Sequence, residues 1–298
     1  MKIGWLVVLG VVAVAMSADA ALAWGPVTHV HLASQLLSEA GAIGVGMMAL
    51  IARHAKHFLY GNIAADVVFG KRLSKVKHSC HKWSTAWDLL EAARTDEQQV
   101  FAYGYLTHLA ADVVAHNKYV PWQLLMTRTT MNFGHIFWEM RADGHVESGC
   151  WPQLQETLLQ PFPQHEVLLE RHLENTLFSF ETNLRIFNHM NLVASAARWR
   201  KLVGHWGRLS RWPLEPDLIG HYHAESLSLM RMALRQVDDP VLTRQDPSGA
   251  ATLEQVRQNR RLLRRLSWQG LNGRWLAESM AEPYAPARRS SARRTSVA

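Results

Sequence analysis

Histidines and carboxylic acids recur at helical spacing in two stretches of the chain. His108, Asp112 and His116 follow one another at steps of four residues, and Glu139 follows His135 by the same step. Residues four apart lie on one face of an α-helix, so each set forms a stripe of metal-ligating groups within apolar sequence. A divalent cation is the simplest compensation for burying such groups. Nitrogen and carboxylate ligands with few thiols favour zinc, although manganese and iron accept the same groups.

Two further polar clusters precede these stripes, again within apolar, helix-like sequence. The first is the segment Trp24-Gly25-Pro26-Val27-Thr28-His29, and the second is Asp66 followed by His81. Any one of these histidines also fits a buried core histidine with a single hydrogen-bond partner. Taken together, so many ligand types on apolar helices are harder to explain without a metal.

The elements that must position these groups are helices. Apolar residues recur at three- and four-residue spacing through much of the chain, as in Val30–Ala40, Trp87–Ala93, Val100–Ala115, Val167–Phe187 and Leu227–Val237. Alternating patterns typical of strands, bounded by hairpin turns, are nearly absent. The sequence therefore predicts an all-α fold, with one compact multi-helix domain over residues 24–280.

Residues 1–23 have the order of a secretory signal peptide. A lysine at position 2 precedes an apolar run from Ile3 to Met16, and small residues end in Ala21-Leu22-Ala23. This order predicts cleavage before Trp24 and export, so that the protein would be periplasmic or secreted. The alternative is an uncleaved membrane anchor, since the apolar run and the residues after it are almost long enough to span a bilayer.

The composition excludes several classes of protein. With 48% apolar and 19% charged residues, the 298-residue chain is too apolar for a disordered protein, and two cysteines are too few for a disulfide scaffold. Cys80 and Cys150 could pair in an oxidising compartment or remain free. The net charge of +7 would help to hold a polyanion such as a nucleic acid.

Basic sequence dominates the last part of the chain. Five arginines between Arg257 and Arg265 are interspersed with Leu262 and Leu263. This pattern favours a surface helix whose arginine stems cover apolar surface, and a contact with an anionic membrane surface is the alternative. Residues 281–298 have almost no apolar periodicity and are predicted to form a disordered basic tail.

The order of the polar clusters resembles the zinc-dependent phospholipase C family, whose relatives include fungal single-strand-specific nucleases and the amino-terminal domain of glycosylphosphatidylinositol-specific phospholipase D. The resemblance covers Trp24 to about Glu139 and continues less closely, as helical sequence, to about residue 240. It implies a phospholipase C/nuclease-like fold with three zinc ions. The ligands that it implies are Trp24, His29, Asp66, His81, His108, Asp112, His116, His135 and Glu139.

The resemblance also implies a role for each ligand. Trp24, as the first residue of the processed chain, would bind one ion through its amino group and carbonyl oxygen, together with His29. Asp66 would be a ligand and the proton acceptor, and so the catalytic residue. His81 is favoured over His78 by its distance from Asp66.

The other ligands complete this assignment. Asp112, which shares a helix with His108, would bridge two ions. The set His116, His135 and Glu139 would hold the remaining ion.

Two departures from the family pattern bear on the substrate. Ala65 replaces the usual proline before Asp66, and the step from Asp112 to His116 is four residues, where classical secreted phospholipases and fungal nucleases have six. The shorter step is shared with the phospholipase D amino-terminal domain and many bacterial relatives. The departures leave the fold inference intact and the particular substrate open.

The function expected from the residues and the resemblance is an exported zinc-dependent phosphodiester hydrolase. A phospholipase C that cleaves glycerophospholipid headgroups is favoured, with a phospholipid as partner and an anionic membrane surface as a peripheral contact. A single-strand-specific nuclease and a non-catalytic lipid- or metal-binding protein are the alternatives. Lys118, Arg128 and Arg141 lie near the ligands in sequence, and exposed, solvated side chains are the favoured interpretation of all three.

Overall fold

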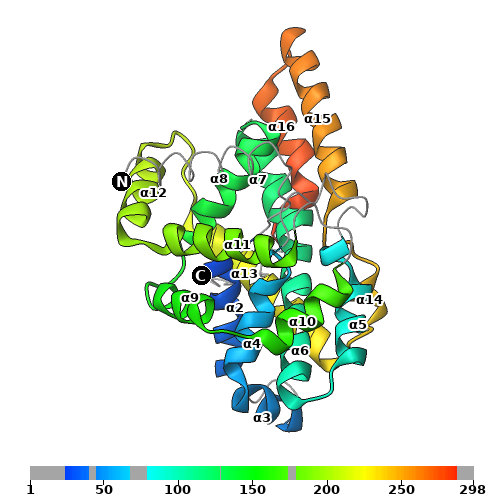
Figure 1. The fold of residues 1–298 in the computed structure, drawn as a ribbon. Coiled ribbons are helices and arrows are strands. Elements are labelled where there is room, and N and C mark those ends of the chain that lie inside the picture. The colour runs from blue at the N-terminus through cyan, green and yellow to red at the C-terminus, as the bar shows by residue number, and fades with distance from the viewer. Residues whose placement is uncertain (1–23, 40–44, 68–78, 128, 174–178, 287–298) are drawn as a thin grey trace, which may run out of the picture.

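The computed structural model describes residues 24–39, 45–67, 79–127, 129–173 and 179–286. Within these ranges the chain forms helices and no β-strand, which confirms the predicted all-α class (Figure 1). The predicted signal peptide, residues 1–23, lies outside the described residues. Among the helices of the described ranges, none combines the length and the apolar character that crossing a membrane requires.

The first half of the chain surrounds one long buried helix, α6. Thr95 caps its start by accepting a hydrogen bond from the backbone N–H of Gln98, and two acids occupy its first turn. The elements in order are α2 (Pro26–Ser38), α3 (Val45–Arg53), α4 (Ala55–Ala64), the 3-10 helix η1 (Ser79–His81), α5 (Trp83–Ala92), α6 (Asp96–Val114), the π-helical turn η2 (Ala115–Tyr119), α7 (Val120–Thr127) and α8 (Met131–Asp143). Helices α4, α5 and α13 pack directly against α6.

The second half contributes helices that cover this core. They are α9 (Cys150–Leu159), α10 (Pro163–His172), α11 (Phe180–Ser195), α12 (Ala197–Leu209), α13 (Pro216–Arg235), α14 (Pro240–Thr243), α15 (Ala250–Trp268), α16 (Gly273–Ala281) and the 3-10 helix η3 (Glu282–Tyr284). The apolar pattern of Val167–Phe187 falls on two helices, α10 and α11.

Two glycines allow α4 and α6 to cross at very short range. A Cβ atom on Gly61 would lie 2.1 Å from the carbonyl oxygen of Phe101, and one on Gly104 would lie 2.3 Å from that of Phe58. No other residue fits this crossing without moving one helix, because the obstacles are backbone atoms. The crossing places the end of α4, including Asn62, beside the middle of α6.

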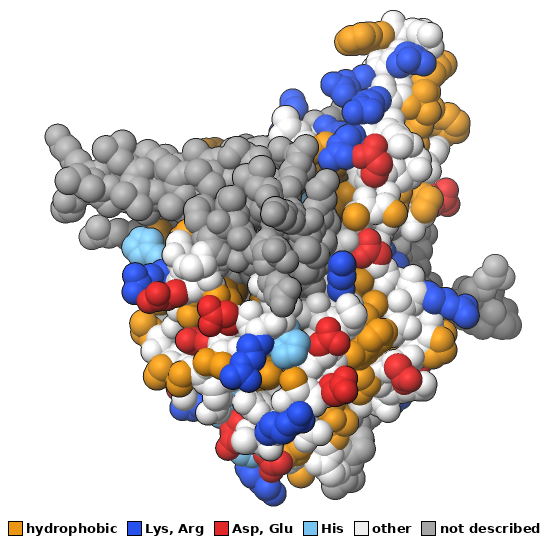
Figure 2. Space-filling model, turned by 45° about the vertical axis from the view of Figure 1, so that its right-hand side comes forward, with side chains coloured by type: hydrophobic (Ala, Val, Ile, Leu, Met, Phe, Trp, Pro, Cys, Tyr) orange, Lys and Arg blue, Asp and Glu red, His pale blue; other side chains and the backbone are white. Residues whose placement is uncertain are grey.

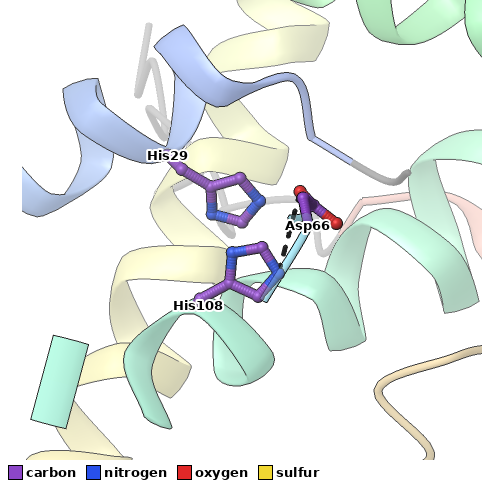
Figure 3. A group of neighbouring side chains, drawn as sticks. All are labelled: His29, Asp66 and His108. Carbon is purple, nitrogen blue, oxygen red and sulfur yellow. Dashed lines mark ion pairs between the residues drawn. The ribbon is translucent and has the colours of Figure 1, made fainter. Parts of the chain in front are cut away.

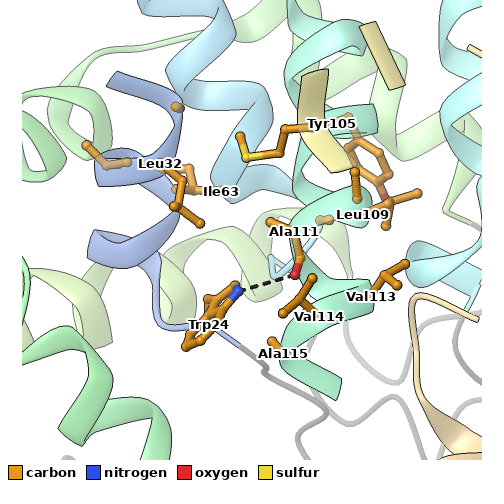
Figure 4. Close-up of a cluster of buried hydrophobic side chains, with 14 of the residues drawn as sticks. Trp24, Leu32, Ile63, Tyr105, Leu109, Ala111, Val113, Val114 and Ala115 are labelled. Carbon is orange, nitrogen blue, oxygen red and sulfur yellow. Dashed lines mark hydrogen bonds between the residues drawn. The ribbon is translucent and has the colours of Figure 1, made fainter. Parts of the chain in front are cut away.

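Trp24, the first residue that the structure describes, is fully buried in the core (Figure 4). Its indole N–H lies 3.2 Å from the carbonyl oxygen of Ala111 on α6 and 3.2 Å from Oγ of Ser226 on α13. Its ring stacks on Tyr119, with the ring centroids 4.7 Å apart. These contacts hold Trp24 next to α6.

Helices α15 and α16 form a hairpin that projects from the rest of the molecule (Figure 1). At its base, Gly249 has a left-handed backbone (φ 57°), and a Cβ atom there would lie 2.5 Å from Cβ of His116. Part of the predicted tail is described: η3 lies within it, and Tyr222 donates a hydrogen bond of 2.9 Å to the carbonyl of Tyr284. Residues 281–286 therefore pack on the core, and residues 287–298 lie outside the described residues.

Candidate metal centre

Six separate elements place histidines and carboxylates around one point beside α6. Asp112 and His108 come from α6 itself. The remaining groups are His29 on α2, Asp66 just after α4, His81 on η1, His116 on η2, and His135 and Glu139 on α8. All eight of these residues are buried.

 Counted by type, the buried set consists of five histidines, two aspartates and one glutamate, namely His29, His81, His108, His116, His135, Asp66, Asp112 and Glu139. Residues far apart in the sequence thus converge in the core.

Asp112 lies at the middle of this set, and its two oxygens face different histidines. Oδ1 is 3.2 Å from Nε2 of His29. Oδ2 is 3.0 Å from Nε2 of His81 and 3.1 Å from Nε2 of His108. A carboxylate with ligand nitrogens beside each oxygen has the geometry needed to bridge two cations.

The nitrogens around Asp112 have the spacing of ligands on a common ion. Nε2 of His81 lies 3.3 Å from Nε2 of His108, and the same His81 nitrogen lies 3.3 Å from Oδ1 of Asp66. Tetrahedral ligands about 2.0–2.1 Å from zinc are roughly 3.3–3.4 Å from one another. The residues present therefore fit a zinc ion held by Asp66, His81, His108 and Asp112.

The backbone of α4 fixes which nitrogen of His108 faces the cluster. Nδ1 of His108 lies 2.7 Å from the carbonyl oxygen of Asn62, which can only accept a hydrogen bond. Nδ1 therefore carries the proton, and Nε2 presents its lone pair toward Asp112. Asn62 was not among the residues singled out from the sequence, although it lies in the segment that ends at Asp66.

His29, Asp66 and His108 form one of two groups whose ligand atoms all lie within 4.8 Å of one another (Figure 3). The other group is His81, Asp112 and His116. This division differs from the sets that the resemblance implies, since it pairs His29 with Asp66. Nε2 of His29 also lies 3.2 Å from Oδ1 of Asp112, so Asp112 remains a candidate partner for it.

The last set of candidate ligands lies on η2 and α8. Nε2 of His135 is 3.1 Å from Oε1 of Glu139, and the rings of His116 and His135 are 5.4 Å apart between centroids. His116 stands 3.9 Å from Asp112, farther than His108 does. It belongs to a π-helical turn and not to a continuous α-helix as the spacing predicted, so the stripe changes direction after α6.

Burial and neighbouring charges together set the protonation of His29 and Asp112 when no metal is bound. Burial lowers the pKa of His29, and His108 adds to the effect, so the ring is neutral and able to bind a cation. Burial alone raises the pKa of Asp112, but His108 and His29 outweigh it and hold that pKa well below the ordinary value. Both Asp112 oxygens and both His29 nitrogens are buried without a well-formed hydrogen bond. Buried polar atoms of this kind fit a centre that binds a cation.

Asp143, at the end of α8, is a residue that the sequence analysis missed. Its Oδ1 accepts hydrogen bonds from the Thr28 hydroxyl at 2.6 Å and the Thr28 backbone N–H at 3.2 Å. A Cβ atom on Gly25 would lie 2.0 Å from Oδ2 of Asp143. Asp143 therefore holds the segment between Trp24 and His29, and its place one helical turn after Glu139 is the signal that could have suggested it.

The remaining sequence candidates lie apart from the ligand cluster or outside the described residues. Lys118 forms an ion pair of 2.8 Å with Glu225. Arg141 is almost fully buried, where the sequence suggested an exposed side chain, and donates to the carbonyl of Trp212 at 3.3 Å. Arg128 and the alternative ligand His78 lie outside the described residues. Cys80 and Cys150 are both buried, and no disulfide joins them.

Helices that bury several histidines and carboxylates around a shared aspartate define a candidate multi-metal centre. The model of the zinc-dependent phospholipase C family matches residues 28–183, which is more than half of the chain. The chain therefore belongs to the zinc-dependent phospholipase C family. No curated protein and no solved structure was found to match it. Family membership supports a phosphodiesterase-type function and zinc as the metal.

Zinc binding at the α8 end of the centre is expected to depend on pH through Glu139. Burial raises the pKa of Glu139 to about 7, although His135 lowers it. A ligand carboxylate must lose its proton, so the apparent zinc affinity of this set should fall at least about tenfold per pH unit below 7. Zinc titrations against a chromogenic chelator at several pH values measure this, and equal affinities on either side of pH 7 would contradict it.

Without bound metal, the Glu139 carboxyl makes the folded state more stable at low pH than at high pH. Its folded pKa of about 7 lies above the ordinary value of 4.5, so between these pH values the folded state keeps a proton that the unfolded state has lost. This contribution to the free energy of unfolding is present below about pH 4.5 and is lost as the pH rises through 7. Thermal denaturation of metal-free protein across this range should show the decline.

Proposed function

We propose that the protein is an exported phospholipase C that releases phosphorylated headgroups from glycerophospholipids, with three zinc ions in its centre. The observation that carries the proposal is Asp112, whose two oxygens lie 3.2 Å and 3.0 Å from histidines on two different elements. A shared carboxylate of this kind suits closely spaced cations, which serve phosphodiester hydrolysis. The family match gives the same reaction class.

Asp66, Asp112 and Asn62 are assigned different roles in the reaction. When bound, zinc supplies a water of lowered pKa and positive charge opposite the phosphoryl oxygens. Asp66 is 1% exposed and lies 3.3 Å from His81 at the same cluster, so it is the group proposed to orient the attacking water and accept its proton. Asp112 sets the spacing of the centre, and the backbone of Asn62 keeps His108 in the ligating tautomer.

Export and activation would be coupled through Trp24. Removal of residues 1–23 would create a new α-amino group at Trp24, whose side chain is anchored to α6 beside Asp112. A neutral amine is a zinc ligand, and an amide nitrogen within an uncleaved chain is not an equivalent one. The proposal therefore assigns the third ion to Trp24, His29 and Asp112, and places the active enzyme in the periplasm or outside the cell.

One additional alanine before Trp24 is expected to remove one zinc equivalent per chain, because it displaces the amino group from its ion. Zinc content measured by mass spectrometry on the processed and extended proteins tests this. An extension that a protease can remove provides the control, since cleavage should restore the lost ion. Unchanged zinc content in the extended protein would exclude Trp24 as a ligand.

The substrate is tested by comparing two classes of phosphodiester. The purified, zinc-loaded protein is incubated with phosphatidylcholine vesicles or with single-stranded DNA, each with and without a chelator. Release of phosphorylated headgroup that the chelator abolishes is the expected result. Release of nucleotides alone would identify a nuclease, and retention of zinc with neither product would identify a non-catalytic member of the family.

A further inference from the structure

The α15–α16 hairpin exposes large hydrophobic side chains to solvent. Trp268 is 89% exposed, Trp275 64%, Leu271 51% and Leu262 42%. All four lie at or near the end of the hairpin, which projects away from the other helices (Figure 1). Exposed hydrophobic groups gathered in one place mark a binding surface, whereas scattered ones need no explanation.

The same hairpin is strongly basic. Its two helices carry six arginines and two glutamates; Glu254 pairs with Arg257 and Glu278 with Arg274. Figure 2 shows Lys and Arg side chains along one side of the projection and hydrophobic side chains toward its end. Arg264 and Arg265 are exposed and form no ion pair with any residue that the structure describes. The surface therefore carries positive charge that the protein does not neutralise.

The arginines and a tryptophan share one face of α15. Arg261, Arg264, Arg265 and Trp268 are spaced at i, i+3, i+4 and i+7, which places them on one side of a helix. The opposite side carries Leu263, which is buried against the rest of the molecule. The basic face is thus fixed outward, because turning it inward would expose Leu263.

We propose that the α15–α16 hairpin docks the protein on anionic phospholipid bilayers. The arginines of α15 contact lipid phosphates, while Trp268, Leu271 and Trp275 enter the interface between headgroups and acyl chains. The inference draws on the proposed function in preferring lipid to nucleic acid, a preference that the side chains of the hairpin also support. It concerns residues beyond the family match, which ends at residue 183.

The side chains of the hairpin favour a bilayer over a nucleic acid. Arginine and tryptophan suit both partners, since tryptophan stacks on bases and also sits at membrane interfaces. Leu262 and Leu271 have no planar ring for stacking, and burial in the interface removes their exposed surface from water. At the base of the hairpin, Gly249 packs against His116, so a docked hairpin is held directly to the metal centre.

Vesicle binding by the purified protein tests the proposal without any need for turnover. The protein is sedimented with vesicles of phosphatidylcholine alone or mixed with phosphatidylglycerol. Binding to the mixed vesicles is expected to exceed binding to phosphatidylcholine. The double variant Trp268→Ser/Trp275→Ser should bind at least about tenfold more weakly. The triple variant Arg261→Gln/Arg264→Gln/Arg265→Gln should lose on the order of a hundredfold.

A matched control replaces exposed leucines elsewhere on the surface. Leu159 and Leu209 are 69% and 72% exposed, and the double variant Leu159→Ser/Leu209→Ser should bind vesicles as the unaltered protein does. All variants should hydrolyse a water-soluble phosphodiester at the unaltered rate, because none of the replaced residues is in the metal centre. Undiminished binding by the tryptophan variant would overturn the proposal, as would binding of single-stranded DNA in place of anionic vesicles.

The failure of this proposal and that of the proposed function give different results. Vesicle binding through the hairpin without headgroup release would leave the docking surface standing and reject the phospholipase. Headgroup release with equal vesicle binding by all variants would do the reverse.

Discussion

Replacing Asp112 with asparagine is expected to lower kcat/KM for phosphodiester hydrolysis by at least about a thousandfold, or roughly 4 kcal/mol of transition-state stabilisation. The physical reason is that the two oxygens of Asp112 stand within 3.2 Å of histidines on both sides, so that its charge would be shared between the ions these histidines hold. The amide keeps the shape but loses the charge. More than one zinc equivalent should be lost per chain, as measured by mass spectrometry.

The control for this variant is Asp88→Asn, which replaces an exposed aspartate on α5. It should retain full zinc content and full activity. Circular dichroism of both variants shows whether the helices are intact. Full zinc content in a folded Asp112→Asn protein would contradict the bridging role, whatever its activity.

Removing zinc is expected to abolish hydrolysis and to lower Tm by roughly 10 °C. A ligand present at about a thousand times its Kd stabilises the folded state by about 4 kcal/mol. Each kcal/mol shifts Tm by about 2–4 °C in a protein of roughly 150–250 residues. Calorimetry before and after dialysis against EDTA measures the change, and added zinc should reverse it. EDTA already saturated with zinc is the control. An unchanged Tm after complete zinc removal would contradict a centre that stabilises the core.

The helical class and the pairs His108–Asp112 and His135–Glu139 could be predicted from local spacing alone. The steps from His108 to Asp112 and from His135 to Glu139 lie within single helices, α6 and α8, so periodicity was sufficient. The approach of Asp66 and His81 to Asp112 is a tertiary contact between separate elements. It was expected only because the order of residues resembles a known family.

Other features had no local signal. The π-helical turn at His116 depends on how η2 packs against α13 and α15, which periodicity does not encode. Asn62 acts through its backbone carbonyl, so its side chain gave no indication of the contact with His108. The hydrogen bonds of Asp143 to Thr28 join residues 115 positions apart.

The glycine crossing of α4 and α6 makes the reactivity of the centre sensitive to a purely mechanical change. Gly61 lies next to Asn62, whose carbonyl oxygen orients His108, and Gly104 lies one helical turn before His108. A single methyl group at either glycine would wedge the two helices apart and carry that strain to the ligands. A substitution remote from any bound substrate can therefore shift the groups that would hold the metal.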